Sequence, residues 1–219
     1  MELYSYFRSS AAWRVRIALA YKGLQVDLHP VHLLRGGGEQ HDAGYRALNP
    51  LGVVPTLIEG SRVFTQSLAI LEYLEDLHPE PALLPSDPAD RAHARALALV
   101  IACDIHPLNN LRVLRYLETT LGVGAREREA WYHNWITLGL KALEIEIARP
   151  GWRGPFCLDA QLTFADICLI PQLYNARRFG VDLLPYPTLV GIEQACLALP
   201  AFTETAPGNQ PDTPREPAP

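Results

Sequence analysis

Short apolar runs that alternate with helix-like runs dominate residues 1–79. The short runs are rich in Leu, Val, Ile and Tyr, as strands are, and the longer runs repeat apolar residues every three or four positions. One helix-like run ends at Lys22-Gly23, where glycine supplies a typical helix cap, and it is apolar on most sides, like a helix between two layers. The pattern predicts the order β-α-β-α-β-β-α, at residues 3–6, 10–21, 26–31, 39–48, 53–58, 62–64 and 65–77.

A proline interrupts one of these strand-like runs. Residues 53–58 read Val-Val-Pro-Thr-Leu-Ile, and a proline cannot donate a hydrogen bond to a neighbouring strand. A cis peptide bond between Val54 and Pro55, at the start of an edge strand, resolves this conflict. We therefore predict a cis proline at this position.

The strand pattern stops after residue 79. Prolines are dense over residues 79–88, which is typical of a linker between domains. Thr163 and Asp166 have the spacing of an N-capping box, which is a structural role. The remaining pattern predicts helices over residues 90–121 with a break near 106–107, over 126–149, from 163 onward and over 189–199.

The fold class that follows is α/β plus all-α. We expect an α/β domain at residues 1–79, a linker at 80–88 and an all-helical domain at 89–219. The end of the chain, from Pro207 on, is rich in Pro, Asp and Thr, and this composition predicts disorder.

Composition and charge narrow the class of protein. The chain has 219 residues, of which 48% are hydrophobic, and this is enough for a real core. The formal net charge of −5 argues against a nucleic-acid or anionic-membrane partner. No apolar run approaches the roughly 20 residues that span a bilayer, and the first residues do not resemble a signal peptide. We expect a cytoplasmic protein.

The four cysteines do not indicate a metal site. Cys103, Cys157, Cys168 and Cys196 form no C-x-x-C pair, and no His/Cys spacing suggests zinc, so no metal is expected. Their neighbours are apolar, which favours free, buried thiols. Tyr132, which shares helical spacing with tryptophans, is likewise interpreted as a core residue.

Two hydroxyls stand where the first helix is expected to begin. Ser9 and Ser10 follow the first strand, beside backbone N–H groups that have no helical partner and the positive end of the helix dipole. Such a helix end can bind an anion, and a thiolate would make it a reactive centre. Arg14 and Arg16, further along this helix, are expected to form ion pairs between domains or subunits.

These features together resemble the cytosolic glutathione transferases. The order of elements, the apolar residue before Pro55 and Gln66-Ser67 at a helix start are similar to the thioredoxin-like domain of that family, and the helical part is similar to its C-terminal domain. Residues 8–19, Arg-Ser-Ser-Ala-Ala-Trp-Arg-Val-Arg-Ile-Ala-Leu, resemble the zeta class, the maleylacetoacetate isomerases. Relatives that isomerise maleylpyruvate are similar at residues 103–110, 175–183 and 210–214. The resemblance covers essentially the whole chain.

The resemblance implies a glutathione site on the first domain. Ser9 and Ser10 are expected beside the thiol, where they would be catalytic. Gln40 is expected at the glycine end of glutathione. The backbone of Val54 is expected to pair with the cysteinyl part of the cofactor.

The other cofactor residues implied by the family lie at a helix start and in the second domain. Gln66 and Ser67 would bind the γ-glutamyl carboxylate, which agrees with the positive end of a helix dipole. His106 and Asn110 would add polar contacts at a cleft between the domains. The family also implies a homodimer.

One position departs from the zeta motif. The motif has a cysteine after the two serines, and this chain has Ala11. The chain therefore lacks a thiol there for mixed-disulfide chemistry, but hydroxyls and the helix end can still stabilise a thiolate. Other transferase classes use an N-terminal tyrosine, so Tyr6 stays an alternative to the serines, with packing as its other role.

The implied substrate is a small dianionic cis-diketo acid. Addition of a thiolate turns its double bond into a single bond that can rotate, and elimination restores a trans double bond. Arginine binds both oxygens of a carboxylate with its planar fork. We expect Arg8, Arg112 and Arg178 to bind the two carboxylates, although Arg112 would face away from Asn110 on a regular helix.

Three functions remain open at this point. The first is a glutathione-dependent cis–trans isomerase, acting on maleylacetoacetate or maleylpyruvate in the catabolism of aromatic compounds. The second is a transferase that conjugates glutathione to small electrophiles. The third is a non-catalytic module with a transferase fold.

Overall fold

The computed structural model describes residues 1–214 and divides into two compact units. The first unit combines Met1–Ala82 with the chain from Ala198 onward, and the second comprises Leu83–Leu197. In the part described, no helix is long and apolar enough to cross a membrane.

A four-stranded mixed sheet forms the centre of the first unit. The strand order is β2-β1-β3-β4, with β1 parallel to β2 and antiparallel to β3, and β3 antiparallel to β4. The order of strands and helices predicted along residues 1–79 is confirmed, and so is the cis peptide bond at Val54-Pro55, directly before β3. The strands are β1 (Glu2–Ser5), β2 (Asp27–Pro30), β3 (Thr56–Glu59) and β4 (Arg62–Thr65).

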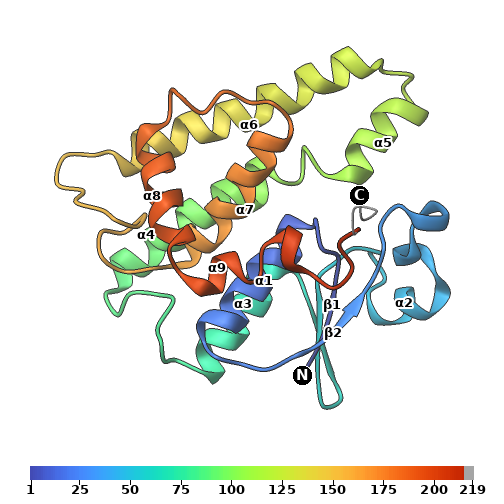
Figure 1. The fold of residues 1–219 in the computed structure, drawn as a ribbon, viewed down its shortest axis with the longest axis horizontal. Coiled ribbons are helices and arrows are strands. Elements are labelled where there is room, and N and C mark those ends of the chain that lie inside the picture. Colours follow the sequence, from blue (N-terminus) through green and yellow to red (C-terminus); the bar gives the residue numbers. More distant parts are fainter. Residues whose placement is uncertain (215–219) are drawn as a thin grey trace, which may run out of the picture. The chain divides into compact units, whose positions relative to one another are not determined.

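Helices cover both sides of this sheet. Figure 1 shows α1 and α3 on one side of the strands and α2 on the other. Every residue of α1 from Ser10 to Leu19 is buried, as expected for a helix between layers, and Gly23 beyond its end has a left-handed φ of 67°. The helices of this unit are α1 (Ser10–Tyr21), α2 (Ala43–Leu48), α3 (Ser67–Leu77) and α9 (Pro200–Thr203), with short helical turns η1 (Arg35–Gly37), η2 (Glu39–His41) and η4 (Pro207–Asn209).

Two arginines of α1 point into the first unit. Arg14 and Arg16 are 1% and 3% exposed, respectively. The expected ion pairs are not seen among residues 1–214. Instead both guanidinium groups donate to neutral oxygen atoms of the first unit, such as the Ser67 hydroxyl and the Thr205 carbonyl.

The chain from Ala198 onward folds onto the first unit, where α9 contacts α1 (Figure 1). The prediction of disorder from Pro207 on is therefore wrong for residues 207–214. They form η4, Asp212 accepts a hydrogen bond from Phe7, and Thr213 donates one to Pro207. Composition could not reveal this, because the stabilising surface comes from the first 16 residues. The prediction for residues 215–219 lies outside the described residues.

The second unit is helical within the described residues. Its central helix α7 is buried from Phe164 to Leu173 and contacts α4, α8 and η3. The long helix predicted over 90–121 is divided by the π-helical turn η3 and a turn at 106–110, and η3 contacts α6 where Gly139 leaves room for Ile105. The elements are α4 (Pro88–Leu99), η3 (Val100–Ile105), α5 (Leu111–Thr119), α6 (Ala125–Ile147), α7 (Phe164–Arg178) and α8 (Pro187–Leu197).

The predicted capping box of α7 is confirmed. The Thr163 hydroxyl accepts from a first-turn N–H group, and the fully buried Asp166 carboxylate accepts from the Thr163 N–H at 2.8 Å and the Cys157 N–H at 2.7 Å. Burial raises the pKa of Asp166 above its ordinary value, against the effect of these hydrogen bonds.

The cysteines are free, and most of them are buried as predicted. Cys157, Cys168 and Cys196 are buried, and burial raises the pKa of the Cys157 thiol. The prediction is wrong for Cys103, which is exposed. It lies on the outer side of η3, while Ile101 and Ile105 of the same turn are buried.

Candidate active site

The N-terminus of α1 presents an accessible hydroxyl at a helix end without an acidic residue. Ser9 is the N-cap, and its Oγ accepts a hydrogen bond from the Ala12 N–H at 3.2 Å. Its own O–H remains a donor. Ser9 is half-buried, whereas Ser10 is buried, so Ser9 is the better placed of the two predicted serines to contact a ligand.

Arg8 lies directly beside this helix end. Its guanidinium is 3.4 Å from the Tyr6 hydroxyl and 5.2 Å from the centre of the Phe7 ring. Tyr6 is buried in an aromatic cluster with Phe7 and His32, with ring centres 4.7 and 5.1 Å away. This burial favours packing over catalysis as the role of Tyr6.

A second helix end of the first unit, at α3, lies beside a buried arginine. Gln66 is exposed and has a left-handed φ of 69°, a strain that costs on the order of 1–3 kcal/mol and is typical of functional sites. The next residue, Ser67, accepts a hydrogen bond from Arg14 at 3.2 Å. No acidic residue lies in the first turn. The backbone dipole and the buried Arg14 charge therefore add up at one place.

Arg14 is a candidate site residue that the sequence analysis did not assign. Its Nε and one Nη are buried and have no hydrogen-bond partner among the described residues. The sequence did contain a signal for this role. The helix that contains Arg14 is apolar on most sides, so a charged residue in it is expected to be buried.

Val54 and Gln40 differ in how well they are placed for a ligand. No hydrogen bond of the described backbone involves the N–H or C=O of Val54, which leaves both groups able to pair with an extended peptide. Gln40 is 5% exposed, its Nε2 lies 3.4 Å from the Leu33 carbonyl, and its Oε1 is buried without a partner. The Gln40 side chain thus has one amide atom held by Leu33 and one that is buried and unpaired among the described residues.

The remaining predicted residues belong to the second unit. Asn110 is the N-cap of α5, and its Oδ1 accepts from the Arg112 N–H at 3.1 Å. Because Asn110 precedes the helix, the expectation that Arg112 faces away from it, which assumed a regular helix through both, does not apply. His106 is half-buried at the end of the π-helical turn, and Arg112 is exposed.

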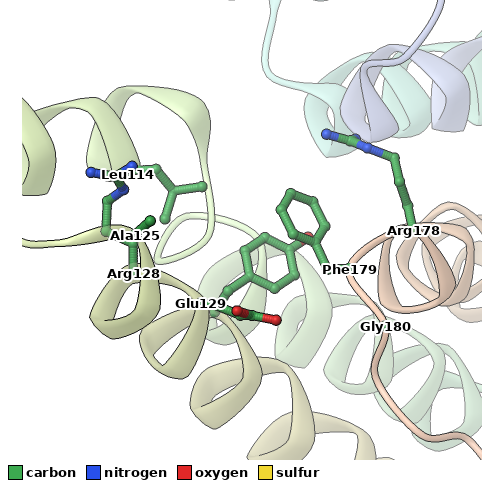
Figure 2. Close-up of a pocket in the computed structure, with 8 residues that line it drawn as sticks. Leu114, Ala125, Arg128, Glu129, Arg178, Phe179 and Gly180 are labelled. Atoms are coloured by element: carbon green, nitrogen blue, oxygen red, sulfur yellow. The ribbon is translucent and has the colours of Figure 1, made fainter.

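Arg178 stands at the rim of a cavity of about 480 Å³ in the second unit (Figure 2). Its guanidinium lies 4.6 Å from the centre of the Phe179 ring, which in turn stacks on Tyr132 at 3.7 Å. Burial raises the pKa of the Tyr132 hydroxyl, with Arg178 opposing the shift. Tyr132 was expected only to pack in the core, but its ring also lines this cavity. The residues lining it are Leu114, Ala125, Arg128, Glu129, Tyr132, Arg178, Phe179 and Gly180.

Comparison with known proteins shows the family of the chain. The family described as "Glutathione S-transferase, N-terminal domain" matches residues 3–82. A probable maleylacetoacetate isomerase of Vibrio cholerae is 50% identical over 96% of this chain and 97% of its own. A bacterial maleylpyruvate isomerase of the zeta class superposes with a TM-score of 0.94 at 44% identity, covering 98% of this chain and 100% of its own. The chain belongs to the zeta class of glutathione S-transferases.

Another similar solved structure contains bound ligands. A maleylacetoacetate isomerase from Methylobacterium extorquens, with bound malonate and glutathione, has a TM-score of 0.94 at 39% identity, and the match covers 98% of this chain and 100% of the other. The fold expected from the sequence, a thioredoxin-like part followed by a helical part, is thus confirmed.

Proposed function

We propose that this protein is a glutathione-dependent cis–trans isomerase that converts a maleyl diketo acid, maleylacetoacetate or maleylpyruvate, into its fumaryl product. The observation that carries the proposal is the N-terminus of α1, where a half-buried serine caps a helix whose first turn has no acid. Zeta-class relatives with both substrate names match nearly the whole chain.

The two helix ends of the first unit fit two anionic groups of glutathione, the thiolate and the γ-glutamyl carboxylate. When bound, glutathione supplies the thiolate that adds reversibly to the substrate. The Ser9 hydroxyl donates to the sulfur, and the end of α1 favours its ionised form. Ser10, which is buried, supports this turn and is the weaker candidate for direct contact.

The γ-glutamyl carboxylate fits the end of α3. Gln66 and Ser67 would contact it, and the Arg14 charge, held at the Ser67 hydroxyl, would strengthen the attraction. Val54 would pair with the cysteinyl peptide through its backbone. Gln40 would contact the glycine end.

We assign the substrate carboxylates to Arg8, Arg112 and Arg178. The malonate in the Methylobacterium extorquens relative is a small dicarboxylate bound together with glutathione, which supports this substrate class. Arg178 beside the Tyr132–Phe179 ring pair offers a charge next to an apolar surface, which suits a carboxylate at the end of a carbon chain. His106 and Asn110 are proposed as further polar contacts.

The decisive experiment supplies each cis substrate with and without glutathione and follows the trans product. We expect formation of the trans acid only with glutathione, and glutathione should be recovered unchanged. Consumption of glutathione with a stable adduct would instead favour the conjugating transferase. Failure to bind glutathione in calorimetry would favour the non-catalytic module.

The arginine assignment has its own test. Arg178→Ala should raise the KM for the dianionic substrate about 10- to 100-fold, the value of a charge-assisted hydrogen bond, and should change the KM for a neutral electrophile little. Arg126→Ala is the matched control, because Arg126 is an exposed arginine of the same unit. Equal effects on both substrates would refute the assignment.

Two broader properties complete the proposal. We propose that the protein works in the cytoplasm, in line with free cysteines and the absence of a membrane-spanning helix in the described part. We also propose a homodimer, which sedimentation would test directly.

A further inference from the structure

The C-terminal segment, defined here as residues 198–214, contacts the chain directly before the reactive helix end. The Asp212 carboxylate accepts a hydrogen bond from the Phe7 N–H at 2.9 Å, although 205 positions separate the two residues. Phe7 immediately precedes Arg8 and Ser9. The far end of the chain thus binds the turn that presents both of these residues.

Arg16 binds the same turn from inside the first unit. Its guanidinium, nearly fully buried, donates to the Phe7 carbonyl at 3.0 Å and to the Tyr6 carbonyl at 3.3 Å. It also donates to the Thr205 carbonyl at 3.2 Å, which connects the turn to the C-terminal segment a second time. Burial lowers the pKa of Arg16 to about 10, and the Asp212 charge opposes that shift.

The C-terminal segment is itself fixed at several points. The Thr205 hydroxyl accepts from the Trp13 indole N–H at 3.0 Å and donates to the Ala201 carbonyl at 2.6 Å. The Thr213 hydroxyl donates to the Pro207 carbonyl. Asp212 therefore approaches Phe7 from a segment whose path is set on both sides.

The result is a turn with both backbone groups of Phe7 occupied. The N–H donates to Asp212 and the C=O accepts from Arg16, while the Ser9 N–H donates to the Tyr6 carbonyl at 2.9 Å. Fixing the peptide groups on both sides of Phe7 restricts where Arg8 and Ser9 can point. A hydroxyl displaced by even 1 Å loses much of its effect on a developing charge.

We propose that Asp212 is a positioning residue for the reaction, and that the C-terminal segment acts as a strap that sets the Tyr6–Ser9 turn. The inference rests on the proposed function, because it concerns the placing of the Ser9 hydroxyl beside the thiol of glutathione. Asp212 acts through Phe7 and does not itself touch the cofactor or the substrate.

The test compares three substitutions of Asp212 in the full-length protein. Asp212→Ala removes the acceptor. Asp212→Asn keeps an acceptor oxygen at the same reach without the charge, and Asp212→Glu keeps the charge but moves the oxygens by one methylene. Glu204→Ala is the matched control, because Glu204 is an exposed acid of the same segment.

Three measurements are made on each variant. The pKa of the enzyme-bound glutathione thiol follows from its ultraviolet thiolate absorbance as a function of pH. The steady-state kcat and KM follow from the isomerase assay. Hydrogen exchange of the Phe7 amide reports the strap alone, and it does not depend on glutathione or on activity.

We expect Asp212→Ala to lower kcat and the thiolate fraction at neutral pH about 3- to 10-fold, with a small change in KM, and to speed Phe7 exchange about 10-fold. Asp212→Asn should restore kcat to within about 2-fold of the natural chain, and Asp212→Glu should restore it less well, because the hydrogen bond depends on reach. Glu204→Ala should match the natural chain.

Other outcomes overturn the inference. An unchanged thiol pKa and kcat in Asp212→Ala, together with faster Phe7 exchange, would make the strap purely structural. If Asp212→Ala does not fold, Asp212→Asn and Asp212→Glu are compared instead. An Asp212→Glu kcat equal to or above that of Asp212→Asn would contradict a positioning role for Asp212. If the natural chain neither binds glutathione nor isomerises, the proposed function fails, whereas the Phe7 exchange still reports the strap.

Discussion

Two helix N-termini of this chain both have a hydroxyl residue as N-cap, but they differ in whether the first turn contains an acidic residue. Ser9 caps α1 and Thr163 caps α7, and in both the second residue after the cap is an alanine, Ala11 or Ala165. The third residue after the cap differs: α7 has Asp166, whereas α1 has Ala12.

That single position separates a structural helix end from a reactive one. In α7 the carboxylate of Asp166 accepts from the N–H groups of Thr163 and Cys157 and occupies the first turn with an acidic group, which the helix dipole favours there. In α1 no residue of the first turn supplies a charge, so an external anion can use the site. The lack of an acid, more than the presence of a serine, distinguishes the candidate active site.

The largest effect is expected on stability at the N-terminus of α7, where Asp166 completes the capping box. Asp166→Ala leaves the Thr163 and Cys157 N–H groups and the Thr163 hydroxyl without their buried acceptor. The free energy of unfolding should fall by about 3–4 kcal/mol. Denaturant unfolding measures it.

Asp166→Asn is the control, because it keeps one acceptor oxygen, and its loss of stability should be smaller. A loss below about 1 kcal/mol in Asp166→Ala, the range of ordinary surface changes, would show that the box is not a major source of stability.

At the N-terminus of α1 we expect the main effect on kcat/KM and only a small effect on stability. Ser9→Ala should lower kcat/KM with glutathione about 100-fold, as for loss of a donor to a developing charge, and should lower stability by only about 1 kcal/mol, the value of one cap. Thr163→Ala should show the reverse, with reduced stability and kcat/KM within about 2-fold. If Ser9→Ala kept full activity, the hydroxyl would have no role at the thiol.

The local part of this comparison could be predicted from the sequence. The capping box of α7 depends on Thr163 and Asp166, three residues apart, and the start of α1 at Ser10 follows from its own first residues. The same holds for the cis peptide before Pro55, because a proline inside an apolar run poses the conflict locally. Helix and strand order therefore came out correctly.

Features that join distant residues could not be predicted in this way. The docking of Asp212 on Phe7 needs a surface that forms only when the first unit folds, and composition alone pointed to disorder. The cavity beside Arg178 likewise depends on Tyr132 stacking on Phe179, from two different helical segments. Neither contact has a periodicity that a single sequence displays.

A cysteine placed at the equivalent alanine of each helix sharpens the comparison. Ala11→Cys puts a thiol in the first turn of α1, where the helix end lowers a thiol pKa. Ala11 is itself only 9% exposed, so the rate is compared with that of a second buried position: in a Cys103→Ser background, which removes the exposed natural thiol, alkylation at neutral pH should be about 10-fold faster for Ala11→Cys than for Ala165→Cys. The isomerase kcat should change by no more than about 3-fold, because glutathione still supplies the nucleophile.

Ala165→Cys is the matched control at α7. That position is 1% exposed and adjoins Asp166, so burial and the carboxylate should keep its thiol unreactive. Equal alkylation rates at the two positions would mean that the two helix ends do not differ in the way we infer.

The smallest expected effect is on the pH dependence of the free energy of unfolding. Asp166 at the start of α7 can titrate, whereas the Ser9 hydroxyl at the start of α1 does not. Because burial raises the pKa of Asp166 above 3.8, the unfolded chain loses this proton at lower pH than the folded chain does. Through that window the free energy of unfolding should fall as pH rises, and the trend should stop once the folded pKa is passed. The contribution appears in denaturant unfolding as the difference between the natural chain and Asp166→Asn, in which the other carboxylates cancel.

Ser9→Ala is the control: its difference in free energy of unfolding from the natural chain should not change over the same pH window, because a hydroxyl does not titrate there. If the difference for Asp166→Asn instead rises with pH, the hydrogen bonds from Thr163 and Cys157 outweigh burial and stabilise the ionised carboxylate at this helix end.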